Sequence, residues 1–205
     1  CKVHGHSAHS SLTPQGVNAI DYAARIIVFL QGLSKQLQTQ HEQDAAFDVP
    51  FSTLNVGRIR GGTAVNIITN ECGLQFGYRN LPTMNTDAVL LPLKAYVQEL
   101  IQEMQQVHGD ATIVLKQMEQ VPAMQSEEGN ALYSLIEGLV DEHKRSKVAY
   151  ATEGGHFQLA DMHAVICGPG SIAQAHKADE YIELTQLARC DRFLQQLLHT
   201  QSIKN

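Results

Sequence analysis

The stretch FSTLNVGRIRGGTAVNIITNECGLQFGYR, residues 51–79, carries the pattern that decides the fold. Its first part, residues 51–59, mixes β-branched and apolar residues, which favours an extended strand. The tripeptide RGG at 60–62 supplies the turn, and 63–79 is a second long strand candidate whose glycines permit bulges or close approach. The stretch is therefore predicted to form a β-hairpin.

Amphipathic helices are predicted on both sides of this hairpin. On the N-terminal side, Thr13 is the N-cap candidate and Pro14 fits the first helical position, where a missing N–H costs nothing. The apolar residues of this helix recur at helical spacing at Val17, Ile20, Ala24, Ile27 and Val28. The apolar residues of the second helix are Leu90, Leu93, Val97, Leu100, Ile101 and Met104. Pro92 predicts that the second helix starts near Leu91 or is kinked.

Two further strands complete the first domain. Residues 1–8 alternate apolar and polar side chains, and ATIVLKQM at 111–118 reads as a strand. The order β-α-β-β-α-β is the split βαβ or ferredoxin-like arrangement, in which two helices cover one face of an antiparallel sheet. Residues 1–118 are predicted to form this domain.

Residues 119–205 show a different pattern, in which short strands alternate with helices. Helices are predicted from Glu127 through His143 and from about Glu183 to His199, with a short helical piece between them. Strands are predicted at 147–151 and 164–167. This alternation indicates a parallel α/β sheet, whose functional loops follow the carboxyl ends of its strands. Two strands are too few for such a sheet, so we expect this segment to be the C-terminal part of a larger α/β domain.

Composition excludes several classes of function. The chain has 205 residues, 43% of them apolar, and a net charge of −6, so it is expected to be globular and not to bind nucleic acid. No apolar stretch approaches the roughly 20 residues that span a bilayer, so no membrane role is expected. The four cysteines lie far apart without metal-binding pairs, which favours a reducing cytoplasm.

The loop GPGSIAQAHKADEY, residues 168–181, follows the strand predicted at 164–167. Gly168 and Gly170 let the backbone bend sharply, and Ser171 follows them. His176 then sits where a catalytic or metal-binding histidine of a parallel sheet would lie, and its imidazole could be one ligand of a zinc ion. The alternative is a surface histidine beside solvated carboxylates.

Two other post-strand segments carry candidate residues. Glu153, in TEGGHF at 152–157, could hydrogen-bond substrate or metal-bound water, or it could cap the helix that follows. His6 and His9, in GHSAHSS at 5–11, are three residues apart, which on a strand sends them to opposite faces and disfavours a shared metal. One of them could act alone as a donor to an oxyanion, and the alternative is a polar strand end that caps the next helix.

Asn66 and Arg79 are the remaining polar candidates in strand-like surroundings. A guanidinium binds a carboxylate through two parallel hydrogen bonds, and an amide can fix a carbonyl. Together they suggest recognition of an amino-acid-like anion. The alternative for Arg79 is a solvated strand residue.

These stretches, taken together and in this order, resemble the metal-dependent aminoacylase and deacylase peptidases of the M20 family along almost the entire chain. The resemblance implies a two-domain enzyme: an α/β catalytic domain with two zinc or cobalt ions, and an inserted ferredoxin-like lid domain that forms a homodimer. The family members that this sequence resembles most remove the acetyl group from N2-acetyl-L-ornithine in arginine synthesis. Others cleave N-succinyl-diaminopimelate or act as general aminoacylases or dipeptidases.

The resemblance also implies roles for individual residues. His176 resembles the family's C-terminal metal ligand, and His9 matches the histidine that reaches the partner subunit's active site to stabilise the oxyanion, with His6 less suited to that role. Asn66 and Arg79 resemble lid residues that bind the substrate's carbonyl and carboxylate. Residues 168–171 resemble a loop lining the pocket, and Glu153 occupies a position at which relatives carry an acidic residue.

The family's other metal ligands and its general base would lie upstream of Cys1. We therefore expect this polypeptide to be inactive and metal-poor by itself. A hypothesis from another class is a stand-alone ferredoxin-like module for dimerisation or amino-acid binding.

Overall fold

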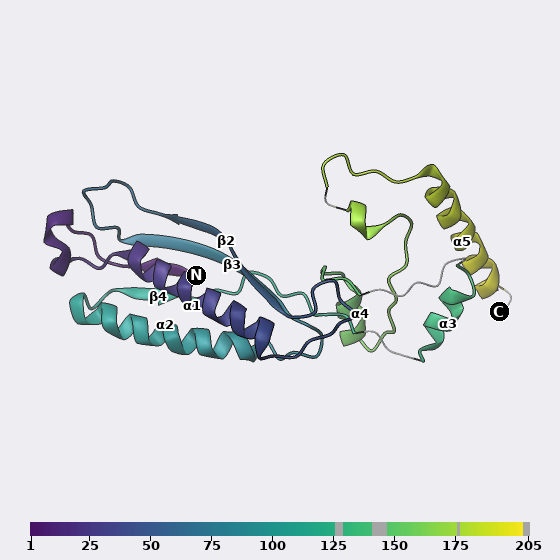
Figure 1. Cartoon of the computed structure of the whole chain (residues 1–205), viewed down its shortest axis with the longest axis horizontal. Coiled ribbons are helices and arrows are strands. Elements are labelled where there is room, and N and C mark those ends of the chain that lie inside the picture. The colour runs from purple at the N-terminus through teal and green to yellow at the C-terminus, as the bar shows by residue number, and fades with distance from the viewer. Residues whose placement is uncertain (126–128, 141–146, 176, 203–205) are drawn as a thin grey trace. The chain divides into compact units, whose positions relative to one another are not determined.

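The computed structural model describes residues 1–125, 129–140, 147–175 and 177–202 (Figure 1). It divides into two compact units. The first contains Cys1–Gln120 and Lys147–Tyr150, and the second contains the rest of the described chain. Among the described residues, no helix combines the length and apolar character needed to cross a bilayer.

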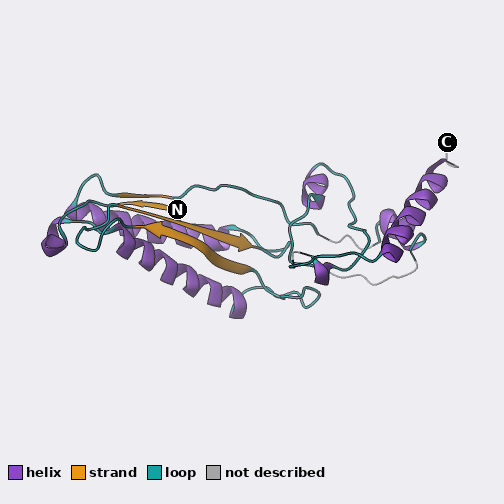
Figure 2. Ribbon diagram, turned by 90° about the horizontal axis from the view of Figure 1, so that it is seen from above, coloured by secondary structure: helices purple, strands orange, loops and turns teal. Residues whose placement is uncertain are grey.

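The first unit is built on one antiparallel sheet in the order β2-β3-β1-β4. Its strands are β1 (Lys2–His4), β2 (Thr53–Gly61), β3 (Glu71–Arg79) and β4 (Thr112–Val114). Two long helices, α1 (Ala19–Thr39) and α2 (Asp87–Val107), run along the sheet (Figures 1 and 2). This order of elements confirms the predicted ferredoxin-like arrangement.

The core of the first unit lies between the helix pair and the sheet. Its strand residues include Val3, Cys72, Leu74 and Ile113. The buried residues of α1 are Ala19, Ala23, Ile26, Leu30, Leu33 and Leu37. The predicted face of this helix was partly wrong: Ile20 and Val28 are 37% and 66% exposed, whereas Ile27 packs against the core and Val17, just before the helix, is buried. In several turns of α1 two apolar residues are neighbours in the sequence, so helical spacing fits two adjacent stripes on the helix surface. Spacing alone therefore does not decide which stripe is buried.

The first helix also starts later than Thr13 and Pro14 predict. These two residues belong to a separate 3-10 helix, η1 (Ser10–Gln15), and α1 begins after Asn18. The Asn18 side-chain oxygen accepts a hydrogen bond from the Ile20 N–H at 3.1 Å, which is the usual N-cap contact.

Helix α2 begins at Asp87 and runs through Pro92, so it starts one turn earlier than Leu91. Its buried residues are Val89, Leu93, Val97, Leu100 and Met104. Four of these five belong to the predicted apolar set, which confirms the core-facing side of this helix.

Three of the four strands are shorter than predicted. β2 has the predicted length but lies two residues later, so Arg60 and Gly61 belong to the strand and the predicted turn at 60–62 is replaced by a longer connection that ends at Asn70. β1 ends at His4. At the next residue, Gly5, the backbone passes so close to the Val17 carbonyl oxygen that a Cβ would lie 2.0 Å from it, so only glycine fits there. The second hairpin strand begins at Glu71 rather than residue 63, and β4 covers only 112–114. The register between β2 and β3 shifts between Val56 and Arg58, so the bulge lies in the first strand of the hairpin.

The second unit contains α3 (Ala131–Glu137), α4 (Gly154–Leu159), the 3-10 helix η2 (Ile172–Gln174) and α5 (Leu184–Ser202). The strands predicted at 147–151 and 164–167 are absent: Lys147 makes one isolated bridge to Phe47 within the first unit, and 164–167 is irregular. A parallel strand needs neighbours along its length to complete its hydrogen bonds, and among the described residues these two segments gain no more than the single bridge to Phe47. Within the range 127–143, for which one helix is predicted, the structure shows the shorter helix α3. Residues 127–128 and 141–143 of that range lie outside the described residues.

Candidate functional site

Two loops that are far apart in the sequence are joined at one end of the sheet. The segment after β1 bonds to the connection between β2 and β3 through Gly5 N–H to Asn70 O at 2.8 Å and Ser10 N–H to Asn66 O at 3.0 Å. An isolated bridge also pairs His9 with Ile67. Figure 1 shows both segments at the same end of the sheet. The structure therefore brings His9 and Asn66, 57 positions apart, into one loop pair.

The His9 imidazole is held by a residue of its own loop. Its Nδ1 accepts a hydrogen bond from the Ser11 backbone N–H at 3.2 Å and lies 2.8 Å from the Ser11 hydroxyl. His9 is the N-cap of η1, with φ −66° and ψ 140°. Because a backbone N–H can only donate, Nδ1 must be the acceptor, and a neutral ring then carries its proton on Nε2. The side chain is exposed, so this N–H can reach a group outside its own loop.

His6 lies in a different environment. Its ring stacks on His108 with 3.7 Å between centroids and 12° between planes. Its backbone exchanges two hydrogen bonds of 2.9 Å with Val17. The expectation that His6 and His9 occupy opposite faces of one strand does not apply, since β1 ends before both. Of the two, the exposed His9 is the better placed to reach another molecule.

Asn66 and Arg79 are both exposed but lie at opposite ends of β3. Arg79 is the last residue of β3 and pairs with Thr53, whereas Asn66 precedes the first residue, Glu71. Nine strand residues separate the two ends by about 26 Å at roughly 3.3 Å per residue. The structure therefore does not bring them to one small molecule within a single chain.

Glu153 is exposed and occupies the N-cap position of α4, but its carboxylate makes no cap hydrogen bond. The Thr152 hydroxyl accepts from the Gly154 N–H at 3.2 Å instead. Local capping is thus done by Thr152, and the Glu153 carboxylate is not used for it.

The loop around residues 168–171 has the sharp bend that its glycines predict. Gly170 has φ +86°, a conformation in which a side chain is strained. The Ser171 hydroxyl accepts from the Ala173 N–H at 3.3 Å and caps η2. Gly168 is exposed, with open space around it. His176, the predicted metal ligand, lies outside the described residues.

No group of three or more His, Cys, Asp or Glu side chains that could hold a metal ion occurs among the described residues. The donor set of the described part therefore does not fit a dinuclear metal site.

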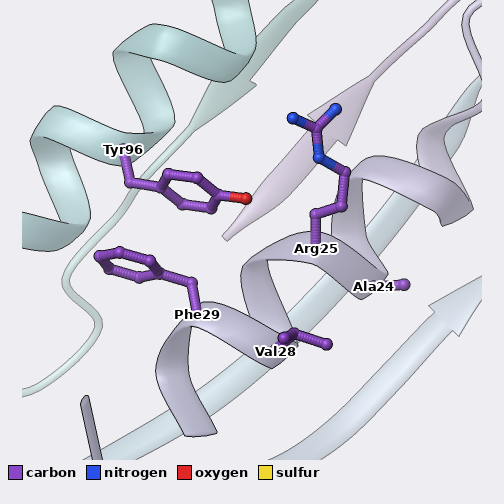
Figure 3. Close-up of a pocket in the computed structure, with 5 residues that line it drawn as sticks. All are labelled: Ala24, Arg25, Val28, Phe29 and Tyr96. Carbon is purple, nitrogen blue, oxygen red and sulfur yellow. The ribbon is translucent and has the colours of Figure 1, made fainter. Parts of the chain in front are cut away.

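An open pocket of about 360 Å³ lies on the helix layer of the first unit. It is lined by Ala24, Arg25, Val28 and Phe29 of α1 and by Tyr96 of α2, whose ring stacks on Phe29 (Figure 3). Its walls are almost entirely apolar, and none of the candidate residues lies in it.

The sequence did not single out Ser11 or Ser52 as functional or structural anchors. The local signal for Ser11 is that a hydroxyl two residues from a histidine at a helix start is within hydrogen-bond reach of its ring. The buried Ser52 accepts from the Leu81 N–H at 2.9 Å and so anchors the turn that follows Arg79. This contact joins residues 29 positions apart, and no local pattern indicates it.

Comparison with known sequences gives consistent matches. The peptidase dimerisation domain of the M20 type matches residues 1–105. The acetylornithine deacetylase of Photorhabdus laumondii is 30% identical over 204 residues, which is 100% of this chain and 51% of that protein. The acetylornithine deacetylase of Proteus mirabilis is 32% identical over 197 residues, covering 96% and 49%. The chain spans about half the length of these relatives.

Solved structures share the fold at low sequence identity. The aminopeptidase PepT of Bacillus cereus has a TM-score of 0.68 at 18% identity and covers 94% of this chain and 48% of its own. A tripeptidase of Staphylococcus aureus has a TM-score of 0.66 at 20% identity, with the same coverage. At these identities the likeness shows the fold alone.

Proposed function

The chain belongs to the M20 peptidase family, and from that premise we propose that it is part of a dinuclear-metal amidohydrolase that removes the acetyl group from N2-acetyl-L-ornithine in arginine biosynthesis. The relatives named acetylornithine deacetylase align with nearly the whole chain, which supports this substrate. The observation that carries the chemistry is the exposed His9 imidazole, whose Nδ1 is engaged by Ser11 and whose Nε2–H is left to donate.

His9 is proposed to stabilise the negative charge that forms on the amide oxygen during hydrolysis. A donor aimed at such an oxyanion acts mainly in the transition state, because charge develops there. Asn66, joined to the His9 loop through Ser10, is proposed to fix the substrate carbonyl with its amide. Arg79 is proposed to bind the amino-acid carboxylate through its guanidinium fork. Glu153 and residues 168–171 are proposed to line the substrate pocket of the intact enzyme.

The length of β3 supports an active site shared between two subunits. Arg79 lies at the opposite end of the strand from the His9 and Asn66 loops, so one chain cannot place all three on one substrate. A homodimer formed through the ferredoxin-like domain lets Arg79 of one subunit act with His9 and Asn66 of the other. The match to a domain described as a peptidase dimerisation domain supports such a dimer.

Two zinc ions per subunit, or cobalt, are proposed as the cofactors, with His176 as one ligand. Bound metals of this kind polarise the amide carbonyl and activate water. The remaining ligands are proposed to come from a part of the protein outside this chain, so the chain alone is expected to lack turnover. Tight binding of two zinc ions by the isolated chain in a titration would contradict this expectation.

The proposed location is the cytoplasm. All four cysteines, Cys1, Cys72, Cys167 and Cys190, are free thiols. This state suits a reducing compartment. No nucleic acid or membrane partner is proposed.

Subunit complementation in the intact protein tests the shared site. His9→Ala and Arg79→Ala are each expected to abolish most turnover of N2-acetyl-L-ornithine. Mixed and re-associated, they should regain about a quarter of wild-type activity, since half the dimers are mixed and each has one intact site. Recovery of no activity from mixed dimers, verified by differently tagged subunits, would refute the shared site.

A substrate panel tests the specificity. The intact protein is expected to turn over N2-acetyl-L-ornithine with a higher kcat/KM than N-succinyl-diaminopimelate or a dipeptide. A preference for either of the others would replace the acetylornithine assignment while retaining the amidohydrolase class.

A further inference from the structure

The surface imidazole of His9 is fixed at one nitrogen by a single neighbouring residue. Ser11 presents two groups to Nδ1: its backbone N–H at 3.2 Å and its hydroxyl oxygen at 2.8 Å. An exposed histidine without such contacts rotates about its side-chain bonds and exchanges the proton between its two ring nitrogens. Ser11 limits both kinds of freedom.

The same turn is tied to the opposite loop. The Leu12 N–H donates to the His9 carbonyl at 2.8 Å, and the Ser10 N–H donates to the Asn66 carbonyl at 3.0 Å. The backbone on both sides of the His9 ring is therefore held in relation to Asn66. What remains to be set is the orientation of the ring, and the contacts to Nδ1 set it.

We propose that Ser11 is a positioning residue for His9, holding the imidazole so that Nε2–H points to the oxyanion formed from the substrate amide. This inference rests on the proposed function of His9. Ser11 itself touches neither substrate nor metal in this proposal. Its effect on the reaction passes through the tautomer and orientation of the histidine ring.

The kinetic test uses Ser11→Ala in the intact protein that contains this chain. The alanine keeps the backbone N–H and loses the hydroxyl, so kcat for N2-acetyl-L-ornithine is expected to fall between about twofold and tenfold while KM changes little. Ser11→Thr restores the hydroxyl and is expected to restore kcat. Ser7→Ala is the matched control, because Ser7 is an exposed serine of the same loop with no side-chain hydrogen bond among those described.

A spectroscopic test is independent of activity. In the 205-residue chain labelled with 15N-histidine, at pH 8, the His9 signals are assigned by their loss in His9→Gln. The wild-type Nδ1 shift is expected to be that of an unprotonated ring nitrogen, and Ser11→Ala is expected to bring the two nitrogen shifts closer together. Ser11→Thr is expected to return them to the wild-type positions.

The outcomes separate the two proposals. If His9→Ala abolishes turnover but Ser11→Ala retains full kcat and an unchanged 15N spectrum, the role of Ser11 is overturned and that of His9 stands. If His9→Ala retains full turnover, the proposed function of His9 fails, and the positioning role fails with it. A fall in kcat that Ser11→Thr rescues, together with the 15N shift, supports the positioning role.

Discussion

At the scale of single residues, Glu103 is the centre of the most extensive ion-pair contact of the helix layer. Both of its oxygens accept from Arg25, at 2.6 and 2.8 Å, and the Tyr22 hydroxyl donates to it at 3.1 Å. The hydrogen bonds from Arg25 lower the pKa of the Glu103 carboxyl. About half of each of the two charged side chains is exposed, so solvent screens the pair.

Glu103→Gln is expected to lower the free energy of unfolding at pH 7 by about 0.5–1 kcal/mol, since exposed pairs contribute little and this one is bidentate. Because the folded-state pKa is depressed, the contribution is present above the unfolded pKa of about 4.3 and is lost as pH falls through the folded pKa. Urea unfolding at pH 7 and in steps below pH 4.5 measures both effects.

Glu99→Gln, on an exposed position one turn earlier in α2, is the control for Glu103→Gln and is expected to change stability little at either pH. If Glu103→Gln loses stability on acidification as steeply as the wild type over this range, the Arg25 contact is not the source of the acid sensitivity.

Replacing Ser52 is expected to lower the free energy of unfolding more than replacing Glu103. Its side chain is 1% exposed, and its hydroxyl accepts from Leu81 N–H and donates to the Met84 sulfur at 3.1 Å. Ser52→Ala leaves a buried N–H without a partner, so unfolding should become easier by about 1–3 kcal/mol. Thermal and urea unfolding measure this loss.

Ser34→Ala provides the comparison for Ser52→Ala. The half-buried Ser34 hydroxyl donates to the Leu54 carbonyl at 3.4 Å, and its removal should cost less. If Ser34→Ala and Ser52→Ala lower the free energy of unfolding equally, burial of the unpaired Leu81 N–H is not what makes the Ser52 substitution destabilising.

At the scale of elements, the two long helices and the hairpin were predictable, and their exact ends were not. Spacing found the buried side of α2 because its apolar residues form one stripe. In α1 the apolar residues form two stripes, and contact with the sheet selects the one that includes Ala19 and Ala23. The 3-10 turn that contains Pro14 arises because the chain first pairs at Val17 before the helix starts.

Pro92 lies inside α2, where it removes one backbone hydrogen bond and its ring crowds the preceding turn. Its side chain is exposed, so Pro92→Ala changes no core contact. The substitution is expected to raise the free energy of unfolding by about 1–3 kcal/mol, with part of the gain offset by the greater freedom of the unfolded chain. The urea midpoint should rise while the m-value stays the same.

Pro82, in the turn before α2, is the matched proline. Pro82→Ala removes a restraint on the unfolded chain without completing a helix, so it should be neutral or lower stability by up to about 1 kcal/mol. A stabilising Pro82→Ala together with a destabilising Pro92→Ala would contradict the assignment of helix strain to Pro92.

At the scale of the whole molecule, local patterns predicted the topology of the first unit but not which candidate residues meet. Each of His9 and Asn66 stood out in its own segment. Their proximity depends on loop-to-loop hydrogen bonds, Ser10 to Asn66 and Gly5 to Asn70, between residues 56 and 65 positions apart. The separation of Arg79 depends on the length of β3. The strands predicted at 147–151 and 164–167 failed for a different reason, since strand-forming residues make a strand only where a neighbour pairs along them.

The distribution of burial predicts how the chain responds to proteases. Every fully buried apolar side chain among the described residues lies between Val3 and Ile113. In the second unit large apolar side chains such as Leu159, Ile166 and Leu184 are 76%, 62% and 80% exposed. Since burial of apolar surface is the main stabilising term, local opening should cost far less in the second unit than in the first.

Limited proteolysis of the 205-residue chain is therefore expected to cut first within residues 121–205 and to leave a resistant fragment of about the first unit. In hydrogen exchange, the slowest amides should belong to α1, α2 and the strands between them, because those amides exchange only when the whole first unit unfolds. Mass spectrometry of the early fragments identifies the cut sites. Early cleavage within residues 19–107, or equal exchange protection in both units, would show that the stability of the chain does not reside in the first unit.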